Sequence, residues 1–175
     1  MIWDKYPERN NVKPKIFRFI GYSGSGKTTL IEKIVKKLSN DGIKVATIKH
    51  DVHGLDIDKP GKDSYRYSEA GAKISVVSSP EIVVYKIHNE LSLEEIISNI
   101  KDVDIIIIEG YSSDSNYITF SVARKDNIKG IKGNFDNLNG VISDYNKDEL
   151  LKIGFNGKHF NLNDIDGIIS FMLNL

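Results

Sequence analysis

Cysteine is absent from the 175-residue sequence, and tryptophan, methionine and proline are scarce, with 1, 2 and 4 residues respectively. Without cysteine the chain forms neither a disulfide framework nor a thiolate metal site. This composition is compatible with the cytoplasm, which is the location we expect. No apolar stretch approaches the roughly 18 residues of a membrane-spanning helix. The charged first residues do not predict a signal peptide, so we expect no membrane contact.

An excess of charge of one sign is also absent, because 24 Lys and Arg residues balance 24 Asp and Glu residues. Broad nucleic-acid-binding surfaces depend on an excess of Lys and Arg, so we expect no nucleic-acid partner. The length, together with 40% apolar residues, is enough for one domain with a substantial core. We therefore expect a single domain over residues 1–175, with residues 1–14 as an extended lead-in.

The most informative stretch that is present covers residues 21–28, with the sequence GYSGSGKT. It fits the pattern of a phosphate-binding loop: Gly, four residues, then Gly-Lys-Ser/Thr. The β-branched and aromatic residues of 15–20 predict a strand before it, and apolar residues at helical spacing predict a helix over 29–40 after it. The predicted nucleotide-binding residues are Gly21, Ser23, Gly24, Ser25, Gly26, Lys27, Thr28 and Thr29.

The residue types of this loop explain its expected chemistry. Glycines allow the backbone to turn its N–H groups towards phosphate oxygens, and the following helix adds its positive N-terminal end. Lys27 would reach the β- and γ-phosphates of a nucleoside triphosphate, and the Thr28 hydroxyl would join the coordination of Mg²⁺. The pattern does not indicate which base is bound.

Asp51 is the first acidic candidate for the Mg²⁺ site. Residues 43–48 predict a second strand, and a strand, helix and strand in this order form a right-handed parallel unit. The ends of both strands then lie at one edge of the sheet, which brings Asp51 near the phosphates as a direct or water-mediated Mg²⁺ ligand. A turn-capping role is the alternative. For the nearby His50 and His53, loop, substrate-side and structural roles all remain open.

Glu109 is the second acidic candidate. Residues 103–109 contain four consecutive isoleucines, which predict a central parallel strand buried on both faces. Asp104 begins this strand and Glu109 ends it, about 16 Å apart at about 3.3 Å per residue. Ligands bind at the carboxyl ends of such strands, which selects Glu109 as an Mg²⁺ group or as the group that orients an attacking water. A solvent-facing glutamate is the alternative. Lys27 and Glu109 are thus the candidate catalytic residues.

The remaining chain completes an α/β fold. Residues 73–79 and 81–87 predict two strands around Pro80, which form an antiparallel hairpin because the connection is so short. An edge of this hairpin can pair with a second copy of the chain or be protected by its own lysines. We expect a P-loop NTPase fold: a mostly parallel central sheet with an inserted antiparallel hairpin and helices on both faces. The other elements are expected as helices over 65–70, 92–100 and 163–173 and as strands over 118–124 and 141–143.

A second nucleotide motif is incomplete. Asn146-Lys147-Asp148-Glu149 nearly matches the guanine-recognition motif Asn-Lys-x-Asp, but Glu149 stands where the final aspartate belongs. Guanine recognition and a simple helix cap after a strand are both open for this stretch.

Taken together, these stretches resemble the MobB family, the molybdopterin-guanine dinucleotide biosynthesis adapter proteins. The matching stretches are residues 21–29, 48–54, 58–66, 70–72 and 107–111, followed by Arg124. The resemblance implies a P-loop fold that binds GTP with Mg²⁺, hydrolyses GTP weakly at most and forms a homodimer. It also implies a partner, the molybdenum cofactor guanylyltransferase, and makes molybdopterin a further candidate ligand.

Two other functions use the same loop. A small-molecule kinase generally needs an arginine-bearing lid, whereas the four arginines here, Arg9, Arg18, Arg66 and Arg124, are scattered. A metal-insertion GTPase would favour cysteines or a histidine-rich tract, and the sequence has neither. The GTP-binding adapter is therefore the preferred interpretation.

Overall fold

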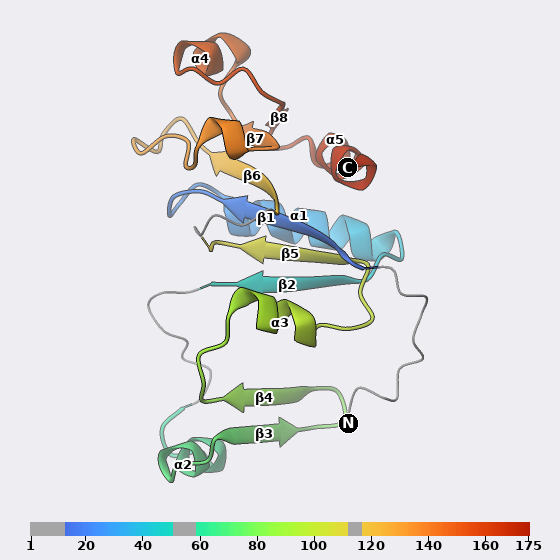
Figure 1. The fold of residues 1–175 in the computed structure, drawn as a ribbon, viewed down its shortest axis with the longest axis vertical. Helices are drawn as coiled ribbons and strands as arrows, with labels where there is room; N and C mark the ends of the chain where they lie inside the picture. The colour runs from blue at the N-terminus through green and yellow to red at the C-terminus, as the bar shows by residue number, and fades with distance from the viewer. Residues whose placement is uncertain (1–12, 51–58, 112–116) are drawn as a thin grey trace. The chain divides into compact units, whose positions relative to one another are not determined.

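The structure is a computed structural model that describes residues 13–50, 59–111 and 117–175. The described residues form two compact units, one within residues 1–50 and 101–175 and the other within residues 51–100. Figure 1 shows the helices and strands of both units. Each unit is described by itself.

A six-stranded parallel sheet forms the centre of the first unit, in the order β2-β5-β1-β6-β7-β8. Its strands are β1 (Lys15–Ile20), β2 (Val45–Lys49), β5 (Ile105–Glu109), β6 (Ile118–Ala123), β7 (Gly140–Ser143) and β8 (His159–Asn161). The strand β1 pairs with β5 on one side and with β6 on the other. The phosphate loop therefore leaves the middle of the sheet, between the ends of these two strands.

One face of this sheet carries the main hydrophobic core. It is covered by α1 (Lys27–Asn40) and α5 (Ile165–Asn174), which contact each other. Phe19 of β1 and Phe120 of β6 are fully buried, and their rings stack with centroids 5.4 Å apart. The apolar face of α1, predicted from its spacing, is the buried one: Leu30, Ile31, Ile34 and Leu38 all lie in this core.

The opposite face has a smaller core near β7. Side chains alternate across a strand, so Val141 points away from its neighbour Ile142 of the main core. Val141 packs with Leu150 of α4 (Lys147–Lys152) and with Phe155, so helices lie on both faces as expected. The short strand β8 was not predicted from the sequence, and α4 was foreseen only as the helix that a cap at Asn146 would begin.

At the start of α4, the stretch that nearly matches the guanine motif forms a helix cap. The Asn146 side chain accepts a hydrogen bond from the Glu149 backbone N–H, and the Glu149 carboxylate accepts one from the Asn146 backbone N–H. This reciprocal pair is a capping box. The Glu149 carboxylate also pairs with Lys125 at 2.6 Å, so both of its functions in this structure are structural.

The second unit contains the predicted antiparallel hairpin as a sheet of its own. Its elements are α2 (Asp63–Glu69), β3 (Ile74–Ser78), β4 (Val83–Ile87) and α3 (Leu93–Asn99). The strands β3 and β4 pair only with each other among the described residues. The mostly parallel sheet and the separate hairpin agree with the expected fold class.

Among the described residues, no helix combines the length and the apolar character that crossing a membrane requires.

Shortening a buried side chain of the central strand β5 should strongly destabilise the first unit. Ile107 of β5 has no exposed surface, and removal of such a side chain typically costs about 2–5 kcal/mol of unfolding free energy. We expect Ile107→Ala to lower the free energy of unfolding by this amount in a urea titration followed by circular dichroism. The control is Ile128→Ala, the same substitution at a fully exposed site, which should stay within about 0.5 kcal/mol of the unaltered chain. Equal losses from both substitutions would contradict the described core.

Candidate functional site

The phosphate loop is held tightly against the neighbouring strand β6. A Cβ atom added to Gly21 would overlap the backbone carbonyl oxygen of Val122. Gly24 and Gly26 have φ angles of 77° and 88°, in the left-handed region that side chains other than glycine rarely adopt. The predicted glycines are thus needed for the shape of the loop.

The side chain of Lys27 lies across the loop that precedes it. Its ammonium group donates hydrogen bonds to the carbonyl oxygens of Gly21 at 3.0 Å and Tyr22 at 2.9 Å. It also lies 3.5 Å from the hydroxyl of Ser25, which is almost completely buried. These bonds tie the loop carbonyls to one cation, so the loop is preorganised before any ligand arrives.

Several charges act on this ammonium group. Partial burial lowers the pKa of Lys27, and the nearby cations Lys132 and Lys49 lower it further. Among the described residues, Glu109 opposes them and raises the Lys27 pKa. The neighbourhood of the loop is therefore rich in positive charge, although the whole chain carries a formal net charge of zero. Such a concentration of cations favours an anionic ligand.

Thr28 and Glu109 meet at the edge of the sheet. The Thr28 hydroxyl lies 3.0 Å and 3.3 Å from the two carboxylate oxygens of Glu109 and donates to them. The parallel register of β1 and β5, which pairs Phe19 with Glu109, brings the end of β5 to the first turn of α1. A hydroxyl and a carboxylate are the oxygen ligands that Mg²⁺ takes in nucleotide sites, so the pair fits this ion.

Asp104, the other acidic residue of β5, has a structural role at the opposite edge of the sheet. Its carboxylate accepts a hydrogen bond of 2.8 Å from the backbone N–H of Lys44, just before β2. The sequence prediction, which used the distance between Asp104 and Glu109 along the strand, therefore selected Glu109, the carboxylate that lies beside the phosphate loop.

Gly110 allows a close contact between two chain segments. A Cβ atom at this position would lie 3.4 Å from the Cβ of His50, and its φ angle is 94°. The His50 ring stacks on the Tyr111 ring with centroids 4.3 Å apart. The residue after β2 and the residues after β5 are thus joined next to Glu109, a pairing that no local pattern in the sequence indicated.

Three sequence predictions lie outside the described residues. They are Asp51 as an Mg²⁺ ligand, the position of His53, and residues 1–12 of the lead-in that was expected over residues 1–14. Within the described part of the chain, no group of three or more His, Cys, Asp or Glu side chains is arranged to hold a metal ion.

Residues after β6 contribute to the loop in ways that the sequence analysis missed. The Asn127 side-chain amide donates to the Ser23 carbonyl oxygen at 3.0 Å. The Lys129 and Lys132 ammonium groups lie 5.7 Å and 5.8 Å from the centroid of the Tyr22 ring. The sequence signals these contacts only by a polar segment after the strand 118–124, because no local pattern indicates that this strand pairs with β1.

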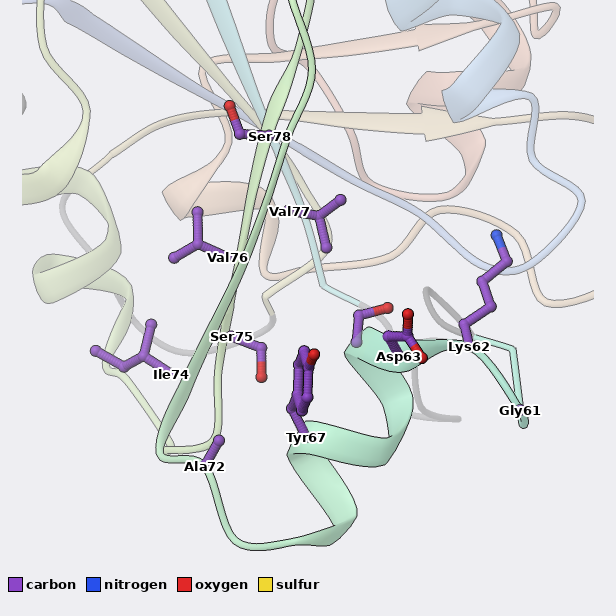
Figure 2. Close-up of a pocket in the computed structure, with 11 residues that line it drawn as sticks. Gly61, Lys62, Asp63, Tyr67, Ala72, Ile74, Ser75, Val76, Val77 and Ser78 are labelled. Atoms are coloured by element: carbon purple, nitrogen blue, oxygen red, sulfur yellow. The ribbon is translucent and has the colours of Figure 1, made fainter.

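The second unit has an open groove of about 840 Å³ between α2 and β3. Figure 2 shows its lining residues, with Tyr67 standing between the helix and the strand. The hydroxyls of Ser68 and Ser75 lie 3.3 Å apart and join the same two elements. The groove contains none of the predicted nucleotide-binding residues.

The family is decided by comparison with known proteins. The family model for molybdopterin guanine dinucleotide synthesis protein B, MobB, matches residues 16–144. The chain belongs to the MobB family. This match covers the phosphate loop, Glu109 and all strands of the main sheet except β8.

Relatives and solved structures of MobB agree with this assignment. A relative from Methanocaldococcus jannaschii is 37% identical over 145 residues, which cover 79% of this chain and 60% of that protein. The molybdopterin-guanine dinucleotide biosynthesis adapter protein of Escherichia coli is 37% identical over 102 residues, or 55% of this chain and 58% of that protein. The chain thus spans about 60% of the length of these relatives. The crystal structure of Bacillus subtilis MobB superposes with a TM-score of 0.70 at 26% identity, covering 89% of this chain and 96% of that one.

Removal of the Glu109 charge should change the titration of Lys27. Glu109 raises the pKa of Lys27, so Glu109→Gln should lower that pKa further and leave more of the amine uncharged at a given pH. We expect labelling of Lys27 by an amine-reactive reagent, followed by peptide mass spectrometry, to shift to lower pH.

The control for this experiment is Asp104→Asn, which removes the other carboxylate of β5, about 16 Å away. It should leave the Lys27 profile in place. A Glu109→Gln profile that is unchanged or moves to higher pH would contradict the described contact.

Proposed function

We propose that the chain binds GTP with Mg²⁺ through the phosphate loop. The backbone N–H groups of the loop and the Lys27 ammonium group would hold the phosphates. Thr28 and Glu109 would hold Mg²⁺, with Asp51 as a further acidic group from the end of β2. The bound ion would neutralise phosphate charge at this site. The observation that supports the proposal most directly is the contact of Thr28 with Glu109 beside the loop that Lys27 organises.

The choice of GTP rests on the chemistry of the family's product. A molybdopterin guanine dinucleotide contains a guanine nucleotide, so its synthesis needs a donor of that nucleotide. We propose that the chain acts as an adapter in this synthesis, in the cytoplasm, and assists the molybdenum cofactor guanylyltransferase. It would present bound GTP or act beside bound molybdopterin, with weak GTP hydrolysis at most.

Lys27→Ala should abolish GTP binding while the chain remains folded. The ammonium group is the loop's own cation, and without it the phosphates lose a charge-assisted partner. We expect calorimetric titration with Mg²⁺ to show a clear preference for GTP over ATP in the unaltered chain, and at least a hundredfold weaker GTP binding in the variant, about 2.7 kcal/mol. In a reaction with guanylyltransferase, molybdopterin and GTP, the unaltered chain should increase dinucleotide formation and the variant should not.

The matched control is Lys36→Ala, which removes an exposed lysine from the same helix α1. It should bind GTP and stimulate the transferase as the unaltered chain does. Undiminished GTP affinity of the Lys27 variant would refute the phosphate-loop assignment. Preference for ATP, or rapid turnover with a small-molecule acceptor, would favour a kinase instead.

We also propose a homodimer that forms through the hairpin. The register of β3 and β4 places Ile74, Val76, Val83, Tyr85 and Ile87 on one face, with exposed fractions between 39% and 53%. The opposite face carries Ser75, which bonds to Ser68 of α2. An isolated two-stranded sheet is marginally stable in water, and an apolar face without charges can pair with an identical copy about a twofold axis.

A charge on this apolar face should separate the two copies. We expect Val76→Lys to change the mass measured by light scattering from dimer to monomer at micromolar concentration. Val77→Lys is the control, because Val77 is equally exposed, at 51%, but lies on the face that carries Ser75. It should leave the dimer intact. A monomeric unaltered chain, or equal effects of both substitutions, would exclude this interface.

A further inference from the structure

Arg124 lies beside the last glycine of the phosphate loop. It follows β6, which neighbours β1 on the side opposite β5. Its Nε and Cδ atoms lie 3.8 Å and 4.0 Å from the point that a Cβ on Gly26 would occupy. The arginine side chain therefore runs past the residue that caps the N-terminus of α1. Because Gly26 has no side chain, nothing separates the guanidinium from the backbone of the loop at this point.

The backbone around Arg124 is fixed against the loop by hydrogen bonds. The N–H of Lys125 donates to the Asp144 carboxylate at 2.8 Å, and the N–H of Asn127 donates to the Arg124 carbonyl oxygen at 3.1 Å. The Asn127 side chain then reaches the Ser23 carbonyl oxygen. These bonds hold the turn next to the loop, so the backbone from which the Arg124 side chain extends is fixed there.

The positive charge of Arg124 has no partner among the described residues, which distinguishes it from the lysines of the same segment. Lys125 forms an ion pair with Glu149, and Lys129 and Lys132 lie over the Tyr22 ring. No hydrogen bond or ion pair joins the exposed Arg124 side chain to any described residue. An arginine fork that lies beside an anion-binding loop, and that has no acceptor among the described residues, is suited to bind a phosphate.

The loop itself offers unused donors at the same place. The first backbone hydrogen bond of α1 runs from Leu30 to Gly26, so the N–H groups of Lys27, Thr28 and Thr29 have no partner within the helix. Such N–H groups attract anions. A phosphate bound to them would lie next to the Arg124 side chain, which passes Gly26.

We propose that Arg124 binds the α- or β-phosphate of the nucleotide from the β6 side of the loop. This inference rests on the proposed nucleotide binding. Thr28 and Glu109 meet on the β5 side, where Mg²⁺ and the γ-phosphate end would lie, whereas Arg124 comes from the other neighbour of β1. Arg124 is therefore a nucleotide-binding residue whose contact is shared by GTP and GDP, and it does not depend on the γ-phosphate.

The test is a calorimetric titration of GTP and GDP, each with Mg²⁺, into the unaltered chain, Arg124→Ala and Arg124→Lys. We expect Arg124→Ala to weaken GTP and GDP by the same factor, about tenfold to a hundredfold, as for a lost hydrogen bond to a charged group. Arg124→Lys should recover part of the affinity, because it retains the charge but not the planar fork. The nucleotide-free melting temperature should not change, since the side chain has no partner among the described residues.

Lys125→Ala is the matched control, because it removes the neighbouring cation, which pairs with Glu149. It should bind both nucleotides as the unaltered chain does. Unchanged affinities of Arg124→Ala would overturn the inference, and so would a loss confined to GTP, which would place the guanidinium at the γ-phosphate. If Arg124→Ala melts at a lower temperature, the test passes to the Arg124→Lys variant. If that variant binds GTP and GDP as tightly as the unaltered chain does, the contact of the planar guanidinium with the phosphate is overturned.

Failure of the underlying function has a different signature. An unaltered chain that binds neither nucleotide, or a Lys27→Ala variant that binds both normally, would overturn the proposed function together with this inference. Nucleotide binding that needs Lys27 but is indifferent to Arg124 would overturn the inference alone.

Discussion

The parallel register between β1 and β5 is the constraint on which the candidate site depends. It pairs Phe19 with Glu109, so that β5 ends where β1 is about to enter the phosphate loop. A shift of this register by one residue would turn Glu109 to the other face of the sheet, away from Thr28. The register is secured by the buried isoleucines of β5 and by Phe17 and Phe19, which cannot leave the core without exposing large apolar surfaces.

The concentration of positive charge around the loop also depends on the arrangement of this sheet. A chain with no formal net charge gathers cations at one edge because three strand ends and the segment after β6 converge there. Lys27 is partly desolvated, and its pKa is lowered by that burial and by Lys132 and Lys49. A bound phosphate group would reduce this mutual repulsion, which favours ligand binding over an empty loop. Because the loop glycines have no side chains, these cations can lie close to the loop backbone.

The second unit differs from the first in that its hairpin leaves apolar side chains exposed. Its hairpin has one face turned to α2, through Ser75 and Ser68, and another that leaves several apolar side chains exposed. The described residues of the phosphate loop and Glu109 belong to the first unit, whereas the association that we propose uses the hairpin of the second unit. The MobB family model matches residues 16–144, which include residues of both units.

The sequence by itself determined the features that depend on neighbours along the chain. The phosphate loop, the helix after it, the hairpin around Pro80 and the choice of Glu109 over Asp104 were all predictable, because glycine spacing, periodicity and strand length act locally. Tertiary structure alone decided which distant residues meet. It buried Arg18 against Thr119 at 3.1 Å, stacked His50 on Tyr111 and placed Arg124 beside Gly26. Each of these contacts joins segments that become neighbours only when the strands pair. Local sequence patterns do not determine the order of strands in a sheet.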